Sequence, residues 1–161
     1  MVAVSTPALV GIAVELFRVK RVLMFYTIPA DDVADELRSA VDFTERMHAA
    51  SSLAVAAGCP EEAIVSIPVA FGGAESRGQA WSYLEGKLAT AISDFRRSSE
   101  SGSLLWECTS GLRVFPHLFE KCFAQRGDQL MVLSSLWQSQ SDHRIPLTEE
   151  LILWTHRGFA E

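Results

Sequence analysis

The sequence predicts a mixed α+β domain, in which a sheet of about four or five strands is flanked by helices. Apolar, β-rich runs alternate with amphipathic segments through the first half of the chain. Residues 104–115 then hold two β-like runs joined by Ser110 and Gly111, a turn typical of an antiparallel hairpin. Such a hairpin favours a mixed sheet over a purely parallel, doubly wound one. With 161 residues, 48% of them apolar, we expect a single domain over residues 1–161.

The first two elements differ in how clearly they are marked. Residues 8–18 fit a helix with Leu9, Ile12 and Leu16 on one face, but the same letters fit a strand, and periodicity does not decide between them. Residues 21–28 are rich in β-branched and aromatic side chains and precede Pro29, so they predict a buried strand.

Residues 31–57 predict one long helix. Asp31 or Asp32 can cap its start, and further acids in the first turn suit the helix dipole. Apolar positions then recur at steps of three or four, as one helical face requires. Gly58 stands where a left-handed C-terminal residue belongs, and Pro60 prevents continuation.

A second strand and a second helix follow. Residues 63–71 fit a strand, and Pro68, which has no N–H group, suggests an edge position or a bulge. Gly72 and Gly73 then turn the chain into a helix from about residue 78 to residue 97. Its apolar stripe comprises Trp81, Leu84, Leu88, Ile92 and Phe95.

The last third contains the predicted hairpin and three further elements. Residues 117–126 fit a short helix closed by Gly127, and residues 129–136 fit a buried strand. Thr148 is a plausible cap for a final helix, with two acids in its first turn and Gly158 at its end.

Composition excludes several classes of function. A formal net charge of −6 and scattered basic residues, apart from the cluster Arg18, Lys20 and Arg21, argue against a nucleic-acid binder. Charges interrupt the oily N-terminal stretch before it reaches the length of a membrane span. We therefore expect a cytoplasmic protein that binds no membrane. Its three cysteines, Cys59, Cys108 and Cys122, are an odd and sparse set, so we expect free thiols.

The turn after the second strand contains the main catalytic candidate. Ala74-Glu75-Ser76-Arg77-Gly78 is a relaxed form of the nucleophile elbow, which exposes a serine between a strand and a helix. Asp128 and His143 follow in the order of a triad, and His156 is an alternative base. The glycine pair before Ser76 and the shortness of the chain count against this hypothesis. A phosphate-binding loop is disfavoured because Gln79 stands where its lysine belongs.

No metal or cofactor site is expected. Cys108, His117, Cys122 and His143 lack the close pairing that structural zinc sites use. Cys108 shares a strand face with Trp106 and should point inward, whereas Glu107 points to the other side. We expect Glu107 to be a surface charge, and a site candidate only if a helix covers it.

By elimination, the sequence favours a binding or assembly module that acts through protein–protein interaction, as a homo-oligomer or with a protein partner. The alternative is a small enzyme or small-molecule binder with a hydrolase-like site around Ser76; the identity of any ligand stays open. Exposed apolar side chains on the terminal segments would form the interaction surface. The candidates are Leu16, Phe17, Trp137 and Trp154.

Overall fold

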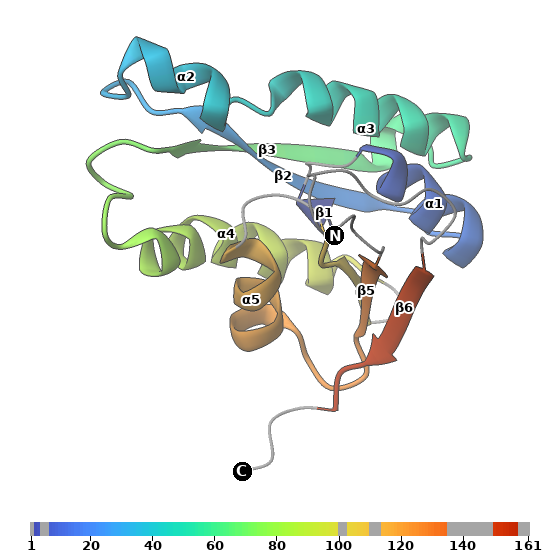
Figure 1. The fold of residues 1–161 in the computed structure, drawn as a ribbon. Coiled ribbons are helices and arrows are strands. Elements are labelled where there is room, and N and C mark those ends of the chain that lie inside the picture. Colours follow the sequence, from blue (N-terminus) through green and yellow to red (C-terminus); the bar gives the residue numbers. More distant parts are fainter. Residues whose placement is uncertain (1, 4–6, 100–102, 110–113, 135–149, 158–161) are drawn as a thin grey trace, which may run out of the picture.

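The computed structural model describes residues 2–3, 7–99, 103–109, 114–134 and 150–157. It confirms a mixed α+β domain with a sheet flanked by helices. Six strands form the sheet in the order β3-β2-β1-β4-β5-β6 (Figure 1). Neighbouring strands are parallel except for β5 and β6, which are antiparallel. The strands are β1 (Val2–Ala3), β2 (Val22–Pro29), β3 (Ile64–Phe71), β4 (Leu105–Glu107), β5 (Gln129–Ser134) and β6 (Glu150–Thr155).

Helices cover both faces of the sheet (Figure 1). On one face, α1 (Pro7–Phe17) and α3 (Thr44–Ala56) bury small and medium side chains against β2, among them Val14, Met24 and Ala50. On the other face lie α4 (Ala80–Arg97), α5 (Val114–Leu118) and the π-helical turn η2 (Phe119–Phe123). They enclose the larger core, which includes Trp106, Phe115 and Phe119.

Several predicted elements are confirmed. The segment that fitted either a helix or a strand is the helix α1. The two strands predicted early in the chain are β2 and β3, and the stripe predicted for α4 contains its four buried residues. β3 is an edge strand, as Pro68 suggested. Gly58 adopts the left-handed conformation expected after a helix, with φ of 100°.

The predicted long helix over residues 31–57 is wrong, because the chain forms two helices there. α2 (Asp35–Val41) ends at Asp42, whose backbone is extended, and α3 begins at Thr44. Oδ1 of Asp42 accepts a hydrogen bond of 3.0 Å from the Thr44 N–H. Thr27 fixes the break from β2, since its hydroxyl donates to the Val41 carbonyl at 2.7 Å. An Asx turn at Asp42 and a side chain from the sheet therefore override the helical period.

The predicted hairpin over residues 104–115 is also wrong. β4 lies between β1 and β5 and is parallel to both, and Val114 begins the helix α5. Ser110 and Gly111 lie outside the described residues. The sheet is mixed for another reason, the antiparallel pairing of β5 with β6.

The predicted C-terminal helix is replaced by β6, whose sequence is ELILWT. A short apolar run fits a helix or a strand by pattern alone, and here pairing with β5 decides. The predicted cap, Thr148, lies outside the described residues. β6 is the second edge of the sheet, opposite β3.

Candidate functional site

Ser76 lies in a tightly bonded turn after β3. Its side chain is buried, with 5% of its surface exposed. The hydroxyl accepts a hydrogen bond of 3.0 Å from the Gly72 N–H and donates one of 3.1 Å to the Gly73 carbonyl. A Cβ atom on Gly73 would overlap Asp32, whose carboxylate accepts the Ala74 N–H at 2.7 Å. Ser76 thus stabilises the turn rather than presenting a nucleophile.

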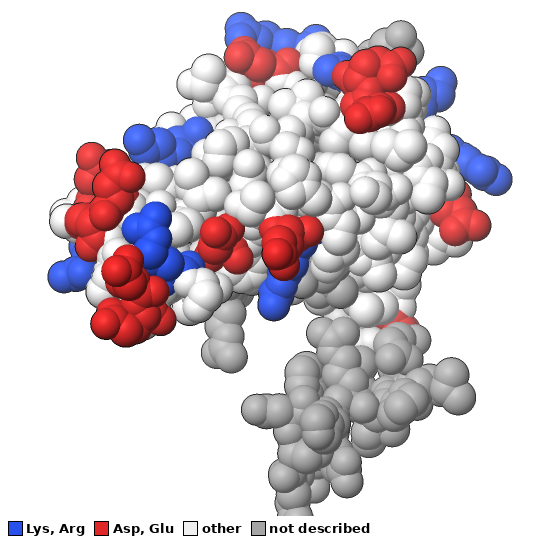
Figure 2. All heavy atoms as spheres, turned by 90° about the horizontal axis from the view of Figure 1, so that it is seen from above, with Lys and Arg blue, Asp and Glu red and all other residues white. Residues whose placement is uncertain are grey.

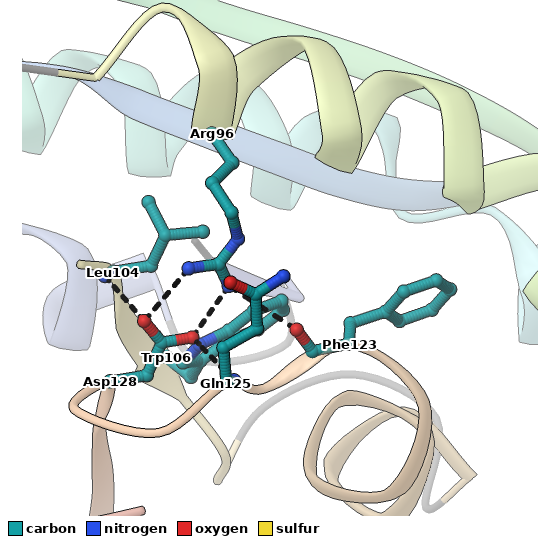
Figure 3. A network of polar contacts seen from close by, with 6 residues as sticks. All are labelled: Arg96, Leu104, Trp106, Phe123, Gln125 and Asp128. Carbon is teal, nitrogen blue, oxygen red and sulfur yellow. Dashed lines mark hydrogen bonds and ion pairs between the residues drawn. The ribbon is translucent and has the colours of Figure 1, made fainter. Parts of the chain in front are cut away.

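Asp128 is the centre of a buried polar network (Figure 3). Arg96 from α4 donates to both carboxylate oxygens, at 2.9 and 2.6 Å, and forms an ion pair with Asp128. Three further donors complete the shell: the backbone N–H groups of Leu104 and Gln125, at 2.9 and 3.0 Å, and the Trp106 indole N–H at 2.8 Å. The network joins α4, β4 and the turn before β5.

The electrostatics of Asp128 suit a structural role. Burial raises the pKa of its carboxyl group, but the hydrogen bonds from Arg96, Gln125, Leu104 and Trp106 outweigh burial and hold the pKa below its usual value. Ser76 follows the carboxyl end of β3, whereas Asp128 precedes the amino end of β5. Because β3 and β5 run in the same direction, the two residues lie at opposite ends of the sheet. His143 lies outside the described residues, so the structure shows only that Ser76 and Asp128 are not brought together.

The cysteines do not form a reactive or metal-binding group. All three are free thiols, and Cys59 and Cys108 are buried. Burial, with a smaller contribution from Glu107, raises the pKa of Cys108 to about 12. Burial also raises the pKa values of Cys59 and Cys122. Among the described residues, no three potential metal ligands cluster together.

We expect alkylation to distinguish the three thiols. In the native protein at pH 8, iodoacetamide should modify only the partly exposed Cys122 at an appreciable rate, because burial keeps the other two protonated and inaccessible. Intact mass should therefore show at most one adduct before unfolding and three after it. The Cys122→Ser variant serves as the control, and fast native labelling of that variant would contradict this account.

Glu107 is not the surface charge that the sequence suggested. Only 1% of its surface is exposed, and its carboxylate accepts the Thr109 N–H at 2.6 Å. Trp106 and Cys108, on either side of it, pack into the core on the α4 side, as predicted. Glu107 therefore lies on the opposite face of β4, where it lines a cavity of about 680 Å³.

This cavity, called here the α1 cavity, lies between α1, the C-terminal end of α4 and the strands β4 and β5. α1 supplies an apolar wall that includes Val10, Ala13, Val14 and Phe17. The connection from α1 to β2 contributes Arg18, Lys20 and Arg21, the basic cluster seen in the sequence. Its volume lies within the range of small-molecule sites.

The predicted interaction residues occupy different surroundings. Leu16 is exposed over 60% of its surface, whereas Phe17 is half-buried and lines the α1 cavity. Trp154 lies on β6 with 38% of its surface exposed, and its neighbours Ile152 and Leu153 are exposed to a similar extent. Trp137 lies outside the described residues. β6 is thus an edge strand with apolar side chains on both of its faces. The helix predicted for this segment did not indicate such an edge.

Charge does not concentrate on the face formed by α2 and α3. Figure 2, which views the molecule from above, shows acidic and basic side chains interspersed around the periphery, with a broad uncharged area between them. This face lacks the continuous basic patch of a non-specific nucleic-acid binder. Within the described ranges, no helix combines the length and the apolar character needed to cross a membrane.

The order of the strands in the sheet reverses between β1 and β4. Open sheets of this kind often bind ligands beyond the carboxyl ends of the strands at such a point. Residues 4–6 and 110–113, which follow β1 and β4, lie outside the described residues.

Comparisons with models of protein families, with curated proteins and with solved structures find no significant match to this chain. Function is therefore argued from the geometry of the described residues.

Proposed function

We propose that the protein is an assembly module that self-associates by strand addition at the outer edge of β6. The observation that supports this most is that the side chains of this edge strand are exposed and largely apolar. Ile152, Leu153 and Trp154 are all exposed, and Glu150 is the only charged residue in the strand. Proteins usually protect an exposed edge strand with prolines, charges or a covering segment. β3, the other edge, carries Pro68, but β6 has no proline.

The backbone hydrogen bonds show which groups of β6 face outward. The His156 N–H donates to the Asp128 carbonyl at 2.7 Å, and the His156 carbonyl accepts from Gly127 at 3.0 Å. In an antiparallel pair, alternate residues direct both backbone groups to the same neighbour. Ile152 and Trp154 therefore pair with β5, while Leu151, Leu153 and Thr155 direct their N–H and C=O groups to the outer edge.

Two copies can pair through these groups in an antiparallel, two-fold arrangement. A continuous sheet requires opposite residues to point to the same face, so the symmetry axis must pass through a residue. Centring the pair on Leu153 places Leu151 opposite Thr155 of the second copy and uses all three outward-facing residues of β6, giving roughly six hydrogen bonds. It also places Trp154 opposite Ile152 of the second copy, an aromatic–aliphatic pair.

This register produces no contact between like charges within the strand. Glu150 lies opposite His156 of the second copy, and every other opposing pair within β6 is uncharged. Centring on Ile152 would leave Thr155 without a partner in β6, so the register through Leu153 is the better of the two. The self-complementary edge supports a second copy, rather than an unrelated strand, as the partner.

Sedimentation equilibrium tests the proposal. We expect the chain to form a dimer at micromolar concentration. Trp154→Ala should raise the dissociation constant of this dimer about tenfold or more. Trp81→Ala is a matched control, because Trp81 is exposed over 36% of its surface but lies on α4. A monomer at high micromolar concentration, or equal effects of the two variants, would contradict self-association through β6.

A further inference from the structure

We propose that the α1 cavity binds a small amphiphilic anion, with its charged head at Arg18 and Lys20 and its apolar body along α1. This inference does not depend on self-association, because none of the described residues that line the cavity belongs to β6. It rests on three features of the cavity: basic side chains that form no ion pair with a described residue, an apolar wall, and one buried carboxylate.

The three basic residues at the cavity do not have the same role. Arg21 donates to the Ser98 carbonyl and hydroxyl at 2.6 and 2.8 Å and lies over the Phe95 ring, 5.1 Å from its centroid. It therefore caps the end of α4. The side chains of Arg18 and Lys20 form no ion pair with any described residue, and both are exposed. Within the described ranges, no carboxylate pairs with these two positive charges, which can therefore bind a ligand at the cavity.

Arg18 also occupies an unusual backbone conformation. It ends α1 with φ of 53°, and it is the only described non-glycine residue with a positive φ. A glycine would adopt this left-handed conformation without strain, whereas an arginine, with its Cβ atom, does not. The strained turn directs the chain from α1 into the segment that carries Lys20, and so brings both basic residues to one cavity.

The rest of the cavity sets the orientation of the ligand. Ala13 and Val14 form part of a wall without hydrogen-bonding side chains, which suits an alkyl or aromatic body. Glu107 is buried on the sheet side, and a carboxylate offers an anion no hydrogen-bond donor there. An anion thus binds with its charge outward, at Arg18 and Lys20, and its apolar part inward.

Calorimetric titration with decanoate, decylammonium and acetate separates the requirement for a negative charge from the requirement for an apolar body. We expect decanoate to bind about tenfold or more tightly than either of the others, because decylammonium has the wrong charge and acetate lacks the body. Equal binding of decylammonium would overturn the charge assignment, and equal binding of acetate would overturn the role of the apolar wall. Absence of decanoate binding would overturn the proposal as a whole.

Two variants locate the site. Arg18→Gln with Lys20→Gln should weaken decanoate binding about tenfold, whereas Arg77→Gln with Lys87→Gln, an equal change of charge at exposed positions that do not line the cavity, should not. Ala13→Phe should abolish binding by filling the cavity, with a thermal unfolding curve to check that it folds. Equal weakening by the two double variants would show that the effect is only one of net charge, and would contradict the site.

Discussion

Replacing Asp128 with asparagine is expected to lower the free energy of unfolding by about 3–5 kcal/mol. Both carboxylate oxygens accept hydrogen bonds from several donors, including the Arg96 guanidinium and the Trp106 indole. The asparagine amide would turn an NH₂ group toward these donors and leave the mostly buried Arg96 charge without its counter-ion. Denaturant unfolding measures this loss.

The loss should depend on pH in a defined direction. The pKa of Asp128 is lower in the folded protein than in the unfolded chain, so its contribution is present above the unfolded-state pKa of about 3.9 and disappears as the pH falls through the folded-state value. The difference between the original protein and Asp128→Asn should therefore shrink in acid. Asp94→Asn is the control, because its ion pair with Arg97 is exposed, and its effect should be below about 0.5 kcal/mol. A pH-independent difference would contradict this description of Asp128.

Leu153→Pro should abolish dimer formation while leaving the monomer folded. The N–H of Leu153 points away from β5, so a proline there removes no hydrogen bond between β6 and β5. It does remove a donor at the centre of the proposed pair and places a ring at the approaching strand. We expect the dissociation constant to rise about 100-fold or more, measured by sedimentation equilibrium, with an unchanged circular dichroism spectrum.

The neighbouring position supplies the control. The N–H of Ile152 faces β5 at Val132, so Ile152→Pro breaks the sheet itself and should destabilise the monomer by about 3 kcal/mol. If Leu153→Pro unfolds the chain as Ile152→Pro does, the assignment of outward and inward groups on β6 is wrong. If it folds and still dimerises, the interface lies elsewhere.

Local signals predicted the early part of the fold well. β2, β3 and α4 have long, consistent patterns, and each lies close to its predicted range. The break between α2 and α3 has a local signal, since the Asp42 side chain accepts the Thr44 N–H two residues on, a turn that competes with the helix. The other cause of the break, Thr27, comes from a distant strand and could not be seen in that segment.

The later part depends on contacts distant in the sequence. The run in β6 is short and uniformly apolar, so its periodicity fits a helix as well, and only pairing with β5 makes it a strand. β4 has three residues, and the hairpin signal beside it was a local turn pattern that the parallel pairing with β1 and β5 overrides.

Functional residues were harder to identify than elements. Ser76 and Asp128 occur in the sequence in the order of a triad. That order does not tell at which end of the parallel strands each residue lies, and the two lie at opposite ends. Trp154, which the sequence placed on a helix, lies on the strand β6 with 38% of its surface exposed, and its role in an interface stays a prediction. The basic cluster at Arg18 was visible in the sequence, but its position at a cavity required the fold.

Disulfide trapping at Leu153 tests self-association through β6 most directly. In the proposed register this residue faces its own copy, with Cα atoms about 5.5 Å apart, within the range that a disulfide spans. Leu151→Cys is the matched control, because its two copies would lie about 13 Å apart along the strands. Under mild oxidation we predict that Leu153→Cys becomes a covalent dimer while Leu151→Cys and the original protein do not. Cross-linking of Leu151→Cys to the same extent, or none at Leu153→Cys, would contradict the account.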